Sequence, residues 1–132
     1  MSVVVGYVAT PEGEAALETA VAEARRLGVR LVVVLSERGH RFSSDSSDIE
    51  RQADEVRLRL DEVGVGYQVL VTSRGRDVAD DIIGAAQNDP AQLIVIGLRR
   101  RSPVGKLLLG SNAQRILLDA PCPVLAVKPA KV

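Results

Sequence analysis

The sequence predicts an α/β fold, with a five-stranded parallel sheet and helices on both of its faces. Five short runs rich in Val, Leu and Ile are apolar on both faces, which is typical of strands buried in a parallel sheet. The four segments between these runs carry apolar residues at helical spacing, so strands and helices alternate along the chain. Right-handed crossovers then produce a three-layer sandwich of the Rossmann-like or flavodoxin-like type.

The predicted strands are short and are separated by polar or glycine-containing segments. They cover residues 2–8, 30–35, 67–72, 92–97 and 122–128. The polar segment 36–46 is predicted to be a loop, and residues 98–110 have no clear period, which predicts a long irregular connection. The sequence contains no internal repeat, and we expect residues 1–132 to form a single domain.

The first three helices are predicted from start and stop signals. The first follows Thr10-Pro11-Glu12, which supplies an N-cap hydroxyl, a proline in the first turn and an acid near the helix start. It ends at Gly28, a residue typical of helix C-termini. The second begins at Ser47, which forms a capping box with Glu50, and the third covers residues 76–88.

The composition of the chain argues against several classes of protein. A chain of 132 residues with one Cys cannot hold a disulfide framework, and no Cys/His cluster could bind structural zinc. The start lacks the features of a signal peptide, and no apolar stretch approaches the roughly 20 residues that span a bilayer, so we expect a soluble cytoplasmic protein without membrane attachment. His40 is the sole histidine and Cys122 is far from it in sequence, so a non-enzyme is favoured over an enzyme.

Charge is distributed unevenly, although Lys and Arg equal Asp and Glu in number. Residues 1–98 carry 10 basic against 16 acidic residues, and residues 99–132 carry 7 against 1, so the last quarter of the chain would attract an anion. The cations at residues 99–101, Lys106 and Arg115 raise the alternative of nucleic-acid binding. Aromatic residues are only 2% of the chain and provide no stacking platform, so nucleic acid is an unlikely partner.

Ligands of open α/β sheets bind where the winding direction reverses at the carboxyl ends of the strands. Periodicity alone leaves two strand orders open, 2-1-3-4-5 and 3-2-1-4-5. In the second order the reversal lies between strands one and four, beside residues 8–10 and 98–110. The latter segment leads to a short fourth helix, predicted to end at residue 119. Its buried residues are predicted to be Ala113, Ile116 and Leu117.

The start of that fourth helix is a candidate phosphate site. Free backbone N–H groups and the helix dipole favour an anion there, and Gly110 permits close approach of a ligand. Ser111 either caps the helix, in a capping box with Gln114, or donates its hydroxyl to the anion. Neither the P-loop nor the dinucleotide fingerprint is present.

Two stretches of sequence resemble the universal stress protein family. Gly97-Leu98-Arg99-Arg100, nine further residues and Gly110-Ser111 resemble the family pattern G-x-x-G, nine residues, then G-S/T. GSNAQRILLDAPCPVLAVKP (residues 110–129) resembles the family's last helix and strand, and TPEGEAALETA (residues 10–20) resembles the start of its first helix. The resemblance extends over essentially the whole chain.

The resemblance implies a strand order of 3-2-1-4-5 and, in many members, binding of ATP, with a metal such as Mg²⁺. It implies a small stress-response or regulatory module that forms a homodimer through antiparallel pairing of the fifth strands. That strand is also apolar and lies at a sheet edge, where an unpaired strand favours association. The implied dimer residues are Val124, Leu125, Ala126 and Val127.

By the same resemblance, the nucleotide would contact three parts of the chain. These are the connection after strand one, the end of strand two, and the segment around the glycine pattern. The residues concerned are Val8, Ala9, Thr10, Leu35, Gly97, Arg99, Arg100, Gly110, Ser111 and Asn112.

Two residues depart from the family pattern. Arg100 replaces the second glycine, and Val8 stands where the family has an acid that contacts the ligand or its metal. The alternatives are therefore a member that binds no nucleotide and acts as a protein-interaction module, or a slow ATPase. The sequence identifies no protein partner.

Overall fold

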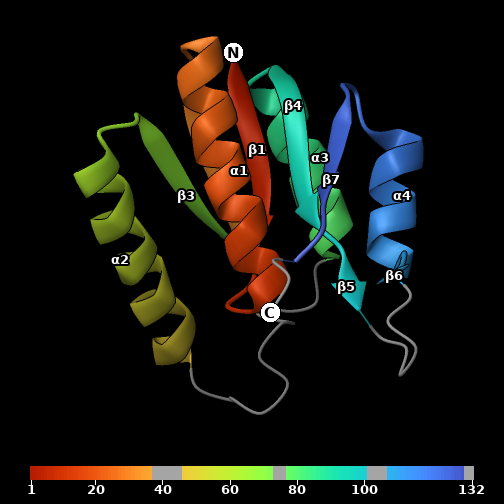
Figure 1. The fold of residues 1–132 in the computed structure, drawn as a ribbon, viewed down its shortest axis with the longest axis horizontal. Helices are drawn as coiled ribbons and strands as arrows, with labels where there is room; N and C mark the ends of the chain where they lie inside the picture. The colour runs from red at the N-terminus through yellow and green to blue at the C-terminus, as the bar shows by residue number, and fades with distance from the viewer. Residues whose placement is uncertain (37–45, 73–76, 101–106, 130–132) are drawn as a thin grey trace.

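The computed structural model describes residues 1–36, 46–72, 77–100 and 107–129, which contain a parallel sheet of five strands (Figure 1). The order in the sheet is β3-β2-β1-β4-β7, which is 3-2-1-4-5 when the strands are counted along the chain. The predicted fold class is confirmed, and the order 2-1-3-4-5 is excluded. The strands are β1 (Ser2–Tyr7), β2 (Arg30–Ser36), β3 (Tyr67–Thr72), β4 (Ala91–Gly97) and β7 (Val124–Val127).

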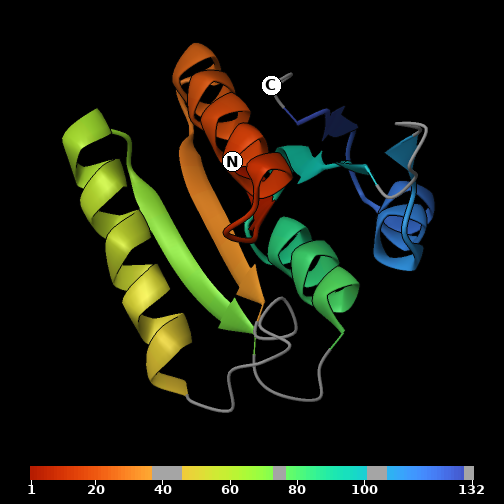
Figure 2. The same cartoon turned by 60° about the horizontal axis from the view of Figure 1, so that its bottom comes forward.

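Two helices cover each face of the sheet (Figure 2). On one face lie α1 (Pro11–Leu27) and α2 (Ser46–Val63), and on the other lie α3 (Val78–Asn88) and α4 (Ser111–Asp119). Figure 1 shows that these helices start at the end of the sheet where the strands finish. None of the described helices is both long and apolar enough to cross a membrane.

Successive residues of the central strands pack into two separate cores. Val3 and Val5 belong to the core beneath α1 and α2, whereas Val4 belongs to the core beneath α3 and α4. Burial on both faces explains why these strands read as continuous apolar runs. The predicted burial of Leu117 is wrong, because α4 is short and lies beside the edge of the sheet, where it buries Ile116 and leaves Leu117 43% exposed.

The helix boundaries test the start and stop signals. Thr10 caps α1 by accepting a hydrogen bond from the Gly13 N–H, and Gly28 ends that helix with a φ of 68°, as predicted. The predicted cap at Ser47 is wrong, since α2 already begins at Ser46. The third helix starts at residue 78, because Asp77 caps it.

The connection after β4 is more regular than predicted. Two-residue strands β5 (Arg99–Arg100) and β6 (Leu107–Leu108) pair antiparallel, with Arg99 opposite Leu108. This pairing returns the chain to the end of β4 just before α4 begins. The expectation of an irregular connection is therefore wrong at its two ends, while residues 101–106 lie outside the described part of the chain.

Candidate functional site

The switch point lies between β1 and β4, as the strand order requires. The register pairs Tyr7 of β1 with Leu35 of β2, and Gly97 of β4 with Val127 of β7. Val5 of β1 pairs with Val95 of β4, so the carboxyl ends of β1 and β4 lie side by side. The Leu98 N–H donates to the Val127 carbonyl at 2.8 Å, which ties the exit of β4 to β7. The predicted site residues lie at these strand ends, in the connections that leave β1 and β4, or in the first turn of α4, and their role in binding stays a prediction.

The connection from β1 to α1 is tightly packed. Tyr7 ends β1, so Val8 lies in the connection with Ala9 and Thr10 rather than in the strand. The Val8 carbonyl accepts a hydrogen bond from the Thr10 N–H at 2.9 Å. A Cβ at Gly13 would lie 1.8 Å from that same carbonyl oxygen, so a glycine is required for this approach. The first turn of α1 thus presses directly against the chain that leaves β1.

Gly97 has a packing role of the same kind. A Cβ at this position would lie 2.4 Å from the Glu12 carbonyl oxygen, because the end of β4 passes directly beside the first turn of α1. The glycine therefore has a structural explanation that is independent of any phosphate. Position 110 differs, since no atom of the described residues stands within 4 Å of a Cβ added to Gly110.

Arg99 and Glu12 bring opposite charges together beside Gly97. The Arg99 Nε lies 3.7 Å from the Glu12 Oε1, and the Glu12 side chain is only 16% exposed. Arg99 itself is 47% exposed. Of the other predicted cations, Arg101 and Lys106 lie outside the described residues, and so does the side chain of Arg100.

The start of α4 has no side-chain cap. Gly110 is the N-cap residue, and Ser111 is already the first helical residue, so the predicted capping box of Ser111 with Gln114 is wrong. The Gln114 N–H donates instead to the Gly110 carbonyl at 3.0 Å, as an ordinary helical bond. Ser111 and Asn112 are exposed, and the first turn contains no acid. The hydroxyl of Ser111 is therefore not used as a cap.

Leu35 differs from the other predicted contacts. Its side chain is 1% exposed and belongs to the core beneath α1 and α2. An adenine near the end of β2 would consequently meet the backbone of this residue rather than its side chain.

Next to the switch point, Tyr7, Glu14 and Arg59 form a polar cluster. The Tyr7 hydroxyl and Arg59 both donate to Glu14, with 2.7 Å between Arg59 Nη2 and Glu14 Oε2. Burial, together with the bond to Glu14 and its negative charge, raises the pKa of Tyr7 to about 12. Burial also raises the pKa of Glu14, but the bonds from Arg59 and Tyr7 outweigh it and leave that pKa below its ordinary value.

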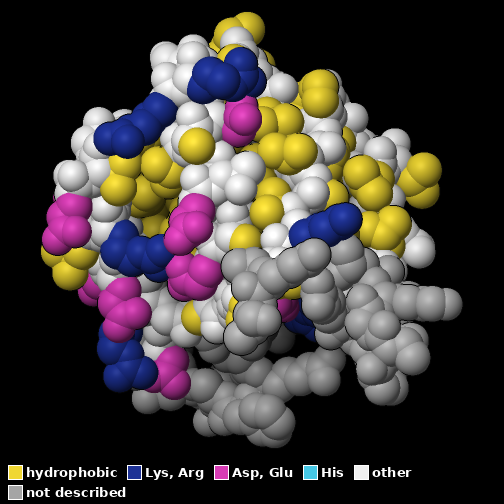
Figure 3. Space-filling model, viewed as in Figure 1, with side chains coloured by type: hydrophobic (Ala, Val, Ile, Leu, Met, Phe, Trp, Pro, Cys, Tyr) yellow, Lys and Arg dark blue, Asp and Glu magenta, His cyan; other side chains and the backbone are white. Residues whose placement is uncertain are grey.

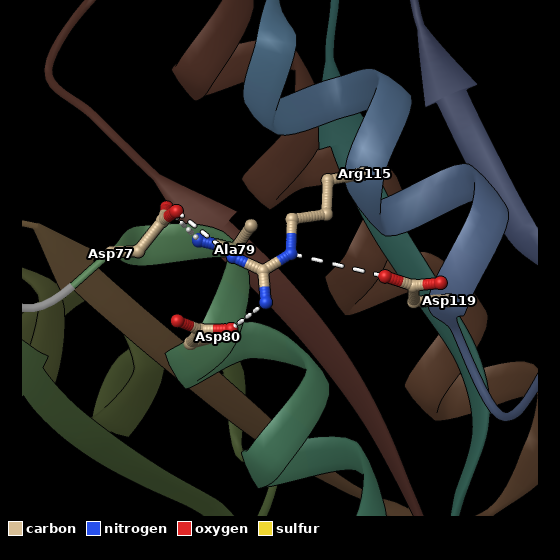
Figure 4. A network of polar contacts seen from close by, with 5 residues as sticks. All are labelled: Asp77, Ala79, Asp80, Arg115 and Asp119. Carbon is tan, nitrogen blue, oxygen red and sulfur yellow. Dashed lines mark hydrogen bonds and ion pairs between the residues drawn. The ribbon is translucent and has the colours of Figure 1, made fainter.

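On the other face of the sheet, Arg115 joins α4 to α3 (Figure 4). Its Nη1 lies 3.0 Å from the Asp77 Oδ2, its Nη2 contacts Asp80, and its Nε lies 3.8 Å from the Asp119 Oδ2. Asp77 also accepts from the Ala79 N–H as the cap of α3. These three carboxylates surround Arg115, which makes it a poor contact for the nucleic-acid backbone considered above.

The side chains at this edge do not fit the Mg²⁺ that the family resemblance implies. Val8 offers no carboxylate, and Glu14 is engaged by Tyr7 and Arg59. Within the described ranges, no three His, Cys, Asp or Glu side chains gather in a way that could hold a metal ion. A cation that entered with a nucleotide would depend on the ligand's phosphates.

The fold and this edge together define a class: a doubly wound α/β protein whose switch point joins the end of β1 to a glycine-initiated last helix. Within that class, the chain belongs to the universal stress protein family, whose sequence profile matches residues 1–128. A universal stress protein of Mycolicibacterium smegmatis is 41% identical over 127 residues, which cover 96% of this chain and 97% of that protein.

Solved structures support the same assignment. The universal stress protein from Archaeoglobus fulgidus aligns with a TM-score of 0.76 at 32% identity, over 97% of this chain and 98% of that one. A structure of the universal stress protein from the same organism in complex with dAMP aligns with a TM-score of 0.75 at 28% identity, over the same shares of the two chains.

At the carboxyl end of the sheet, the sequence did not predict the contacts of three residues, Gly13, Glu12 and Asp77. The packing of Gly13 depends on the position of a carbonyl five residues earlier in the chain, for which the sequence gives no signal. Glu12 was recognised as a first-turn acid, but its partner Arg99 is distant in sequence. Asp77 could have been found, because an Asp followed by an apolar helical run is a typical N-cap.

Proposed function

We propose that this protein is a small, single-domain, dimeric regulatory module of the cytoplasm that binds an adenine nucleotide at the switch point. The ligand's phosphates would lie at the start of α4, against the N–H groups of Ser111 and Asn112. Arg99, which follows the end of β4, would contribute positive charge. The base would lie against the backbone near Leu35.

The observation that carries the proposal is the start of α4. An α-helix leaves its first N–H groups without partners inside the helix. At α4 the residues that the structure describes supply neither a side-chain cap nor a first-turn acid, and Gly110 has no side chain there. The dAMP complex of the related Archaeoglobus protein supports an adenine nucleotide as the ligand.

The departures from the family pattern bear on which nucleotide binds. Without an acid at Val8, a metal ion has one side-chain ligand fewer, which weakens the case for Mg-ATP relative to a monophosphate. The family resemblance keeps ATP among the expected ligands. Slow hydrolysis would need a general base, and the described residues offer no catalytic set beside α4.

Native mass spectrometry of the freshly purified protein tests the proposal. We expect a retained mass of nucleotide size, or its appearance on addition of AMP or of ATP with Mg²⁺. Ser111→Asp should abolish binding, because a carboxylate at the helix start repels phosphate while it favours the helix itself. Gln87→Glu makes the same change in net charge at the far end of α3 and should bind like the wild type. Absence of any nucleotide complex, or unchanged binding by Ser111→Asp, would reject the proposed ligand.

The dimer is proposed from the edge of the sheet. β7 pairs with β4 on one side, and Leu125 is 37% exposed. The neighbouring α4 adds Leu117 and Leu118, which are 43% and 84% exposed. Figure 3 shows hydrophobic side chains gathered on this side, over β7 and α4, whereas charged side chains dominate over α2. A second copy would cover this apolar surface through antiparallel pairing of the two β7 strands.

Light scattering tests the dimer. At micromolar concentration we expect twice the 14.1 kDa mass of one chain. Leu125→Lys should give the single-chain mass, because it places a charge in the interface. Leu58→Lys changes a leucine of α2 that is 66% exposed and should leave the dimer intact. A wild-type mass of one chain would remove the dimer from the proposal.

A further inference from the structure

We propose that Glu12 is a specificity-determining residue, which makes the site favour an adenine nucleotide with few phosphates over one with many. This inference rests on the proposed nucleotide site. It starts from the Arg99–Glu12 pair, in which the carboxylate lies 3.7 Å from the arginine Nε. The carboxylate holds Arg99 near Gly97 in the free protein and competes with a ligand phosphate for its charge.

The position of Glu12 is fixed by packing. Its carbonyl oxygen would stand 2.4 Å from a Cβ at residue 97, so the backbone of Glu12 packs directly against the end of β4. Its side chain is 16% exposed, so the protein covers most of it. The Glu12 carboxylate therefore lies beside Arg99, where the first turn of α1 meets the end of β4.

Glu12 also differs from Glu14, the other acid in the first turn of α1. Glu14 accepts hydrogen bonds from Tyr7 and Arg59, with Arg59 at 2.7 Å, whereas the Arg99–Glu12 separation exceeds hydrogen-bond distance. Arg99 is thus attracted to Glu12 but is not locked by it. A phosphate that approaches Arg99 meets this negative charge, and the repulsion grows with each further phosphate.

The size of the effect follows from Coulomb's law. At about 6 Å in a water-like dielectric, one unit charge changes the Kd of a ligand by about threefold for each unit of ligand charge. ATP carries about two more negative charges than AMP, so the carboxylate lowers the preference for ATP by roughly tenfold. We expect the wild-type protein, without divalent cations, to bind ATP no more tightly than AMP.

Isothermal titration calorimetry with AMP and ATP, in EDTA and at low salt, tests the inference. Glu12→Gln keeps the shape of the side chain and should tighten ATP binding by roughly tenfold more than AMP binding. The matched control Glu18→Gln removes an exposed acid one and a half turns further along α1 and should leave the ratio of the two Kd values unchanged. Salt of about 0.5 M should shrink the effect of Glu12→Gln.

Two results would overturn the inference while leaving the nucleotide site standing. One is an equal change in AMP and ATP affinity in Glu12→Gln. The other needs no variant: wild-type protein that binds ATP more than about tenfold tighter than AMP without divalent cations. If neither nucleotide binds to the wild type or to Glu12→Gln, the proposed function itself fails, and the inference fails with it.

Discussion

Helix α4 starts differently from α1 and α3, although the three helices start at the same end of the sheet (Figure 1). Thr10 caps α1, and its first turn contains Glu12 and Glu14. Asp77 caps α3, and its first turn likewise contains acids. At α4 the cap residue is Gly110, with no side-chain hydrogen bond and no acid in the first turn. Two helix starts are thus capped by side chains, whereas at the third the described residues supply no side-chain cap.

The same contrast holds for packing. The start of α1 fits between the Val8 carbonyl and Gly97 so closely that Gly13 and Gly97 cannot gain a Cβ without displacing backbone. Among the described residues, none would contact a Cβ at Gly110. The comparison teaches that glycines at one end of a sheet can differ in purpose, since two permit close packing of backbone and the third begins a helix without such packing against the described residues.

The largest expected loss of stability comes from adding a methyl group where the start of α1 packs against neighbouring backbone. Gly13→Ala should destabilise the protein by about 3 kcal/mol, and Gly97→Ala by about 2 kcal/mol, because each methyl group would meet backbone atoms that cannot easily move. Urea denaturation followed by circular dichroism measures both. Gly6→Ala is the graded control, because its methyl group would meet only the end of the Ile82 side chain and should cost less.

Gly110→Ala completes this series. We expect the free energy of unfolding to fall by at most about 1 kcal/mol, because the substitution changes only the preference of the N-cap position for Gly over Ala. A loss at residue 110 as large as that at residue 13 would show that the start of α4 is packed like that of α1, and the comparison would then break down.

The fold could be predicted from the sequence because the buried strands of a parallel sheet and the helices between them have distinct periods. The order of the strands could not be obtained from periodicity, since it depends on contacts between distant segments. The resemblance to a family supplied it. At the candidate site, local sequence predicted Gly110 and Arg99 as contacts of a phosphate, and those roles stay predictions. Gly13 and the partner of Glu12 could not, because their roles depend on groups that only the folded sheet brings close.

A smaller loss of stability is expected when Asp77, the cap of α3, is replaced than when the packed glycines are filled. Asp77→Ala should destabilise the protein by about 1.5 kcal/mol, because the Ala79 N–H loses its acceptor and Arg115 loses a partner. Ser111→Ala should change stability by less than about 0.5 kcal/mol, because its hydroxyl makes no cap. Thermal unfolding of both variants measures the difference. Equal losses would mean that Ser111 caps α4 after all.

The smallest expected effect concerns the acid at the start of α1. The pKa of Glu14 is lower in the folded protein than in the unfolded chain, so the unfolded chain takes up this proton first as the pH falls. The stability that Glu14 contributes is therefore present above its ordinary pKa of about 4.5 and is lost as the pH falls below that value.

We expect Glu14→Gln to flatten the acid limb of the stability profile by about 0.5 kcal/mol, the size typical of partly exposed ion pairs. Urea denaturation at intervals between pH 6 and pH 3 measures this. Glu18→Gln, a change to an exposed acid on the same helix, is the control and should follow the wild type. An unchanged acid limb in Glu14→Gln would contradict the assigned role of the cluster with Tyr7 and Arg59.

The central claim is that the N–H groups at the start of α4, which no described side chain caps, receive a phosphate, and amide NMR during titration with AMP tests it most directly. The account predicts saturable shifts that are largest at Ser111, Asn112 and Ala113. The amide of Ala79, which Asp77 already occupies, should move little. Shifts confined to other parts of the chain, or equal shifts at α3 and α4, would contradict it.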